Sequence, residues 1–261
     1  MNAILAIALN TFRETVRERI VYAFMLFAAA ITLASIMLGT LSIGQDVRIL
    51  EDMGMAAIAL IGGAIAVFAG TNLVYKELER RTVYIIFTKP VTGWQFIVGK
   101  YLGLSLCIML IVSAMGLFLA ALVWFCAQSS SMAYIAGAIF GPLALVYLEL
   151  LFVIASATFF STFASPIMSV IFTLSVWLIA HFGESLKSLG MMSQTPAFAK
   201  FSQAVYLLLP DLSSLTKVRS VLMYGEPAPK ELLSFLSCYV LGYILLLLVI
   251  GSVVTEQREF P

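Results

Sequence analysis

The sequence predicts an all-α protein that crosses a membrane six times, and three observations point to this fold class. Hydrophobic residues make up 62% of the 261 residues and charged residues only 11%, whereas soluble domains are about half apolar and a quarter charged. The mean hydropathy of +1.04 agrees with this difference. The apolar residues also gather in six stretches whose lengths are near the roughly 20 residues that a spanning helix needs. Only helices suit such stretches, because lipid offers no partner to unpaired backbone groups.

The six predicted spans are separated by more polar segments, and some of their ends carry recognisable signals. Ser165 and Pro166 resemble an N-cap followed by proline in the first helical turn, which predicts a very short turn before the fifth span. Thr92 and Gln95 have the capping-box spacing and follow Pro90, so a helix is expected to start here and to run into the third span. The spans cover residues 20–41, 53–74, 101–127, 132–160, 166–182 and 236–255.

The chain is predicted to form one transmembrane domain, 1–261, with three segments outside the spans. Residues 1–19 form an amphipathic helix, since apolar side chains recur there every three or four positions. This helix can lie in the membrane interface or pack on a cytosolic partner. Residues 75–100 are expected in the cytoplasm. Residues 183–235 are expected outside it as one or two short helices that lie on or dip into the outer leaflet, with a seventh span as the alternative.

The distribution of Lys and Arg predicts the orientation of the chain. If both termini are cytoplasmic, nine of these residues lie on the inner side and six on the outer side. This excess follows the positive-inside rule. The net charge of only +1 gives no electrostatic footprint for a nucleic acid.

Few polar residues within the spans could carry chemistry. Glu149 lies in the fourth span, where a carboxylate is costly, so it is either a functional residue facing the pathway or a structural hydrogen-bond acceptor between helices. Asn72, near the inner end of the second span, is a weaker candidate that could join helices. The only histidine, His181, has Glu184 three residues on, but one histidine is poor support for a metal site. The three cysteines form no C-x-x-C pair, which argues against a zinc site or a disulfide framework.

No nucleotide-binding or catalytic motif is present in the chain. The segment from Gly93 to Tyr101 is the nearest match to a phosphate loop. It has five residues between its glycines where the motif has four, and Tyr101 replaces the Ser or Thr that would bind Mg²⁺. We therefore expect no cofactor, no metal and no enzymatic activity in this chain.

Several small residues have the spacing that lets spanning helices approach each other closely. They are Gly62 and Gly63, Ala66 with Gly70, Gly99 with Gly103, and Gly137 with Gly141.

The segment 75–100 holds an unusual share of the charges of the chain. Glu77 and Arg81 are four residues apart and could pair on a helix. The apolar run 83–87 that follows is too short to span a membrane. A solvated loop would explain the charges alone, whereas charges flanking an apolar patch favour a docking surface for a soluble partner.

This segment carries a resemblance to a known family. The residues ELERRTVYIIFTKPVTGWQFIVGKY, 77–101, resemble the signature between the second and third spans of type-2 ABC transporter permeases. In that family the signature runs acidic-x-acidic, a basic residue, Thr, apolar residues, Pro, and then Gly-Lys. The stretch NTFRETVRERIVYAF, 10–24, resembles the family's interfacial helix. The chain looks most like permeases of the nitrous-oxide-reductase maturation type.

The resemblance implies the permease subunit of an ATP-driven exporter in the bacterial cytoplasmic (inner) membrane. Two copies of the permease, as a homodimer in lipid, would pair with two cytosolic ABC ATPase subunits, which would bind the ATP and Mg²⁺. A coupling helix between spans two and three would dock on the ATPase, and Asn72 and Glu149 would be candidates for the pathway. The implied coupling residues are Lys76, Glu77, Glu79, Arg80, Arg81, Thr82, Lys89 and Pro90.

Two other functions remain open at this point. The chain could be a non-transporting anchor or a mechanotransmitting subunit, which would link a cytosolic ATPase to an extracytoplasmic partner bound at 183–235. A transporter predicts a polar cavity lined by the second and fifth spans, and an anchor does not. A membrane-embedded enzyme would need clustered His, Asp or Cys in the spans.

Overall fold

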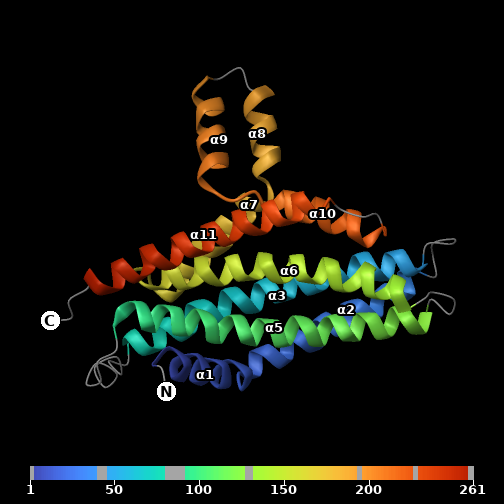
Figure 1. Ribbon diagram of the computed structural model, residues 1–261, viewed down its shortest axis with the longest axis horizontal. Coiled ribbons are helices and arrows are strands. Elements are labelled where there is room, and N and C mark those ends of the chain that lie inside the picture. The colour runs from blue at the N-terminus through green and yellow to red at the C-terminus, as the bar shows by residue number, and fades with distance from the viewer. Residues whose placement is uncertain are drawn as a thin grey trace.

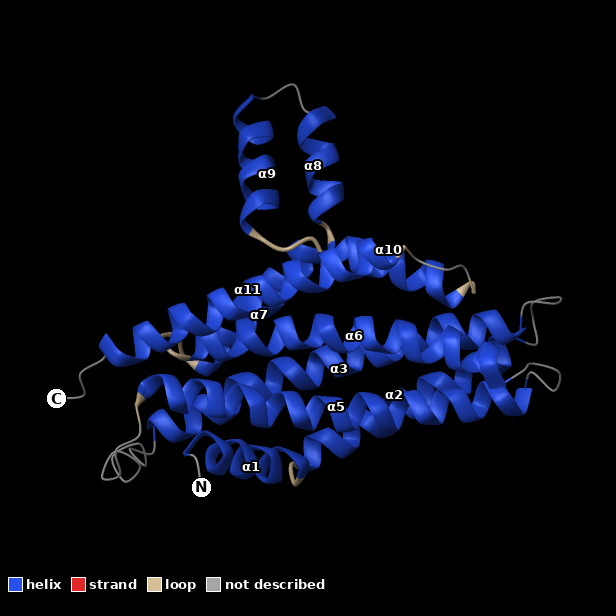
Figure 2. Ribbon diagram, viewed as in Figure 1, coloured by secondary structure: helices blue, strands red, loops and turns tan. Residues whose placement is uncertain are grey.

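A computed structural model describes residues 3–39, 46–79, 92–126, 132–192, 196–225 and 229–257. Within these ranges the secondary structure is helical, with no strand (Figure 2). This confirms the predicted all-α class. The helices are α1 (Ala3–Val16), α2 (Arg19–Gly39), α3 (Asp46–Glu79), α5 (Gly93–Cys126), α6 (Met132–Ser161), α7 (Pro166–His181), α8 (Gly183–Met192), α9 (Pro196–Leu208), α10 (Leu212–Met223) and α11 (Lys230–Gln257).

Four of these helices, α3, α5, α6 and α11, are each long and apolar enough to cross a membrane. Two further pairs meet the same test together but are bent, α1 with α2 by 58° and α7 with α8 by 65°. If each bent pair is one span, the described chain has up to six spans. The predicted number of six spans therefore stays a prediction. Four of the candidate spans are single long helices.

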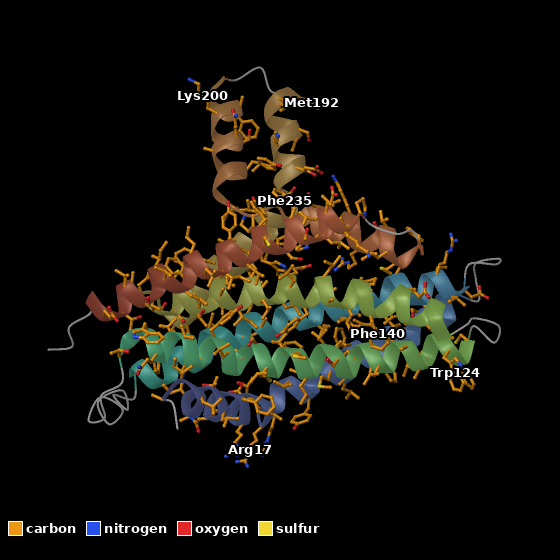
Figure 3. The ribbon with its side chains drawn as sticks, in the orientation of Figure 1. Arg17, Trp124, Phe140, Met192, Lys200 and Phe235 are labelled. Carbon is orange, nitrogen blue, oxygen red and sulfur yellow. The ribbon has the colours of Figure 1, made fainter. Side chains whose placement is uncertain are left out.

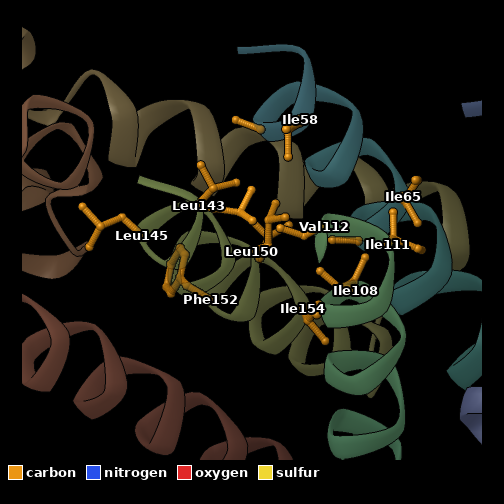
Figure 4. Packing of buried hydrophobic residues seen from close by; sticks show 14 of the residues in the cluster. Ile58, Ile65, Ile108, Ile111, Val112, Leu143, Leu145, Leu150, Phe152 and Ile154 are labelled. Atoms are coloured by element: carbon orange, nitrogen blue, oxygen red, sulfur yellow. The ribbon is translucent and has the colours of Figure 1, made fainter. Parts of the chain in front are cut away.

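The centre of the bundle is formed by α3, α5 and α6, whose branched side chains interlock (Figure 4). Ile65 of α3, Ile108 of α5 and Leu150 of α6 are each 1% exposed or less. In the apolar window of α3, 72% of the residues are buried, against 22% in α11. The helix α3 thus lies inside the bundle, and α11 leaves most of its surface to lipid or to another chain.

Glycines set the closest contacts between helices, as their spacing predicts for three of the four groups. A Cβ on Gly70 would lie 2.6 Å from Cβ of Ala157, so α3 and α6 touch there backbone to backbone. A Cβ on Gly103 would lie 2.5 Å from the carbonyl oxygen of Ala8, which brings α1 against α5. Gly137, in contrast, has nothing within 4 Å of such a Cβ, so this position makes no close helix contact.

The predicted helix starts are found, although some helices are longer than expected. Thr92 N donates to Oε1 of Gln95 at 3.4 Å, the reciprocal bond of a capping box, and α5 begins at Gly93. Ser165 precedes α7 in an extended conformation with proline in the first turn. The last helix begins at Lys230 rather than at residue 236.

The segment between α7 and α11 differs from the prediction in its number of helices. One or two short helices are expected from the sequence, and the structure has three, α8, α9 and α10. Figure 1 shows α8 and α9 as a hairpin that projects sideways from the bundle, with α10 returning beside α6. Met192 and Lys200 lie near the end of this hairpin that is farthest from the bundle (Figure 3). The helix that was not expected from the sequence is α8, which is only ten residues long.

Candidate functional site

The carboxylate of Glu149 is the centre of a buried ionic cluster. The residue lies midway along α6 and is 1% exposed. Trp177 Nε1 donates to its Oε1 at 3.0 Å, and Nε2 of His181 lies 3.4 Å from the same oxygen. Arg219 Nη1 lies 3.7 Å from the other oxygen, Oε2. One carboxylate therefore joins three helices, α6, α7 and α10.

Local structure brings these partners together. Trp177 and His181 are four residues apart on α7, so they share one helical face, and their rings meet edge to face at 5.7 Å. Arg219 is positioned by α10, whose start is capped by Asp211. The Asp211 carboxylate accepts from Ser213 N at 3.1 Å and from Ser214 Oγ at 2.7 Å, which fixes the first turn of the helix.

The cluster balances charge inside the bundle. A lone carboxylate at this depth would cost several kcal/mol, and a guanidinium within ion-pair distance offsets part of that cost. The distance of 3.7 Å is too long for a hydrogen bond. Nη1 of Arg219 is itself buried and makes no hydrogen bond. The pair is thus held by charge alone on its α10 side and by a hydrogen bond on its α7 side.

The ring of His181 contacts both its own helix and Glu149. Nδ1 lies 3.2 Å from the carbonyl oxygen of Trp177. A carbonyl only accepts, so Nδ1 is the donor in this contact. Nε2 is the ring atom that faces the carboxylate oxygen. The imidazole therefore bridges the backbone of α7 and the carboxylate of α6.

The described residues contain no group of three or more His, Cys, Asp and Glu side chains that could hold a metal ion. Glu184, which follows His181 in sequence, pairs instead with Lys217 of α10. The hydrogen bond that the Lys217 ammonium donates to this carboxylate raises the pKa of Lys217. A second contact stabilises the hairpin, where the Lys187 ammonium lies 4.5 Å from the centre of the Tyr206 ring.

The predicted coupling residues lie at the C-terminal end of α3 or follow it in the sequence. Lys76, Glu77 and Glu79 belong to the last turns of α3. Asn72, a predicted pathway residue, precedes them in the same helix. The other predicted coupling residues fall outside the described residues; they are Arg80, Arg81, Thr82, Lys89 and Pro90. The structure therefore brings Glu149 into a cluster but leaves the coupling set a prediction.

Sequence reasoning did not single out two of the three partners of Glu149, Trp177 and Arg219. Trp177 could have been found, because a tryptophan inside a span needs a partner for its N–H. Arg219 gave a weaker signal. It lies in a short amphipathic stretch between α7 and α11, where a basic residue is unremarkable. Only the return of α10 beside α6 brings it to the carboxylate.

Comparison with known proteins identifies the family. No curated protein matches the sequence. The family described as ABC-2 family transporter protein matches residues 5–260, nearly the whole chain. Its members are membrane components of ABC transporters, which agrees with the apolar helices of this structure. The protein therefore belongs to the ABC-2 transporter family as a membrane component that works with an ABC ATPase.

Proposed function

We propose that this chain is the permease of an ATP-driven exporter and works as a homodimer with two copies of a cytosolic ATPase. ATP and Mg²⁺ bind to the ATPase, and the permease itself needs no cofactor. The protein resides in the bacterial cytoplasmic membrane with both termini in the cytoplasm. Within the family we place it with permeases of the nitrous-oxide-reductase maturation type, on the strength of its 77–101 signature.

The surface of α7 is the observation that carries the homodimer. Of its 16 residues, Ser169, Thr173 and Ala180 are buried, and all three are small. Several large apolar side chains of α7 are exposed, among them Ile167, which is 72% exposed, and Ile171, which is 47% exposed. A peripheral helix normally buries a broader apolar face. The exposed face of α7 is therefore suited to a second copy, with the pathway between the two copies lined by α7 and α3.

Coupling to the ATPase follows from the inner end of α3. Lys76, Glu77 and Glu79 continue the span into a charged last turn. The capped start of α5 at Gly93 returns the chain to the bundle. A segment fixed at both ends by long helices can transmit a push from a bound ATPase to α3, which lies at the centre of the core. The coupling residues 76–90 are assigned this role.

The Glu149 cluster would make α6, α7 and α10 move together. It ties α7, which forms the dimer face, to α6 in the core and to α10 on the outer side. A displacement of α7 driven from the cytoplasm would then be carried to α10. Glu149 would thereby act beside the pathway, through the helices that line it.

Cross-linking along α7 tests the homodimer. The exposed cysteines Cys126 and Cys238 are first replaced by alanine, which leaves only the buried Cys107. Ile171→Cys in native membranes should then form a covalent dimer with a short bis-maleimide, because the residue is 47% exposed on the α7 face. Leu102→Cys on α5, 40% exposed and on the other side of the bundle, is the matched control (Figure 1). Equal cross-linking at the two positions would refute the α7 interface.

Co-purification tests the coupling. The tagged chain should bring down an ATPase subunit from its native membrane. Glu77→Ala with Arg81→Ala, or Pro90→Ala, should release that subunit or uncouple its hydrolysis. Lys187→Ala with Lys200→Ala on the hairpin removes charge elsewhere and should leave both properties unchanged. If all variants retain a coupled ATPase, residues 76–90 are not the coupling element.

The hairpin favours a second candidate function, a non-transporting subunit that links the ATPase to an extracytoplasmic partner. The hairpin projects away from the bundle, and Met191 and Met192 near its end are 74% and 82% exposed (Figure 1). For such a subunit, replacing both with serine should abolish capture of the partner, and the unchanged chain should move no substrate into inverted vesicles. If the unchanged chain does transport and the replacement lowers that transport, the hairpin belongs to a transporter.

A further inference from the structure

Two apolar hollows meet on the side of the bundle formed by α1, α2 and α5. The first is an open groove of about 510 Å³ between α1 and α5, and the second is a crevice of about 220 Å³ between α2, α3 and α5. Ala114 lines both, so the groove continues into the crevice. The groove is lined by Leu9, Phe12, Leu106, Met109, Leu110, Ser113, Ala114 and Leu117. The crevice adds Met25, Ala28, Ala29, Thr32, Ile58, Met115 and Phe118.

The way α1 is attached explains why the groove exists. A Cβ on Gly99 would lie 2.9 Å from Ile7, and one on Gly103 would lie 2.5 Å from Ala8 O, so the first half of α1 sits directly on the α5 backbone. The chain then bends by 58° into α2. That helix packs mainly on α3 instead of following α5. The space between α2 and α5 is left open to the outside of the bundle.

The depth of the hollows fits one leaflet. Arg19 starts α2, and Thr32, the farthest residue of α2 in the crevice, lies 13 residues further on. At 1.5 Å per residue this is about 20 Å along the helix. Half of the hydrocarbon core is about 15 Å thick. The hollows therefore run from the level of the charged residues of α1 to near the midplane. With the cytoplasmic N-terminus proposed above, this is the inner leaflet.

Cationic side chains stand beside the polar end of the groove. Arg13 and Arg17 are exposed and occupy the stripe of α1 next to that of Leu9 and Phe12. Figure 3 shows Arg17 pointing away from the bundle beside the end of α1. Glu14 lies further round the helix. The groove thus combines an apolar wall at acyl-chain depth with two cations at headgroup depth, which is the pattern for an anionic phospholipid.

We propose that these hollows bind an anionic phospholipid, with one acyl chain in the groove and crevice and its phosphate at Arg13 and Arg17. The occupant is a bound lipid, not cargo, because α1 and α5 lie on the opposite side of the bundle from α7 (Figure 1). The lipid tail fills the gap that α2 leaves against α5. The bound lipid thereby secures the N-terminal helix to the spans.

Lipid competition tests the site. The full chain is equilibrated in nanodiscs of equal palmitoyl-oleoyl phosphatidylglycerol and phosphatidylcholine, released into mild detergent, and weighed by native mass spectrometry. We expect one retained phosphatidylglycerol per chain, at least tenfold over phosphatidylcholine. Ala114→Phe, which fills the junction, should abolish retention. Ala121→Phe, an exposed alanine seven residues further along α5, should not.

The headgroup is tested separately. Arg13→Gln with Arg17→Gln should reduce the preference for phosphatidylglycerol to near unity, while the same two positions changed to Lys should keep it. Equal retention of both lipids by the wild type would overturn the proposal, as would full retention by Ala114→Phe. Release of a lipid-free dimer that Ala114→Phe dissociates would assign the groove to a second copy. None of these outcomes depends on transport, so they leave the proposed permease function untouched.

Discussion

The ion pair between Glu149 and Arg219 allows an asymmetric prediction. At the observed 3.7 Å, two unit charges attract by about 4 kcal/mol with an effective dielectric constant of about 20. Removing one partner of a buried pair typically costs about 3–5 kcal/mol, because the other charge stays buried. Glu149→Gln leaves a guanidinium, which does not give up its proton in proteins. Nη1 of this guanidinium has no hydrogen bond. Arg219→Met leaves a carboxylate, which keeps its hydrogen bond from Trp177.

We therefore expect Glu149→Gln to be the more damaging change at neutral pH. A loss of about 3 kcal/mol would lower the melting temperature of a chain of this size by roughly 6–12 °C. The double change Glu149→Gln with Arg219→Met should recover most of the loss, since it leaves neither charge buried.

The assay is thermal unfolding of the four proteins in one detergent at neutral pH, followed by size-exclusion chromatography. The double-mutant cycle then gives the coupling energy directly. Strictly additive losses would refute the ion pair as a structural element. A larger loss for Arg219→Met than for Glu149→Gln would refute the asymmetry.

Three further predictions concern single features. Trp177→Phe keeps an aromatic ring but removes the N–H that donates to the Glu149 carboxylate. It should lower the free energy of unfolding by about 1.5–3 kcal/mol. An unchanged thermal stability would show that this hydrogen bond does not stabilise the fold. Gly103→Val should displace α1 and increase its proteolysis, whereas Gly137→Val, which meets open space, should not; equal proteolysis of the two would contradict the close contact. Met192→Cys should react with a water-soluble maleimide and Leu245→Cys on α11 should not. No reaction at Met192→Cys would place the hairpin in lipid.

Much of the fold could be predicted from local signals. Long apolar runs predict α3, α5, α6 and α11, because the length of a span is dictated by the membrane. The capping pattern at Thr92 and the proline at Pro166 predict two helix starts for reasons that act within a few residues. The number of spans could not be predicted from the same local signals. It depends on whether two bent helix pairs each form one span, and such a bend depends on which neighbouring helix each half packs against.

The candidate site was only half predictable, for a physical reason. Glu149 is conspicuous in sequence because a carboxylate within a span is costly. Its partners come from α7 and α10, and the distance in sequence from Glu149 to Arg219 spans a turn, a hairpin and a capped helix. No local sequence pattern indicates that α10 packs back against α6. Contacts that depend on how a hairpin redirects the chain become visible only in three dimensions.

The length of α7 decides what must surround the hairpin. Its 16 residues extend about 24 Å, which is less than the roughly 30 Å hydrocarbon core. If α7 starts at the inner boundary, the hairpin leaves the bundle slightly below the outer one. Glu184, Lys187 and Lys200 cannot lie in hydrocarbon at low cost. The hairpin therefore needs polar surroundings, and it adjoins the same exposed face of α7 that is assigned to the dimer. A second copy whose own hairpin and α7 line a shared aqueous vestibule meets both requirements at once, whereas an isolated chain in lipid meets neither.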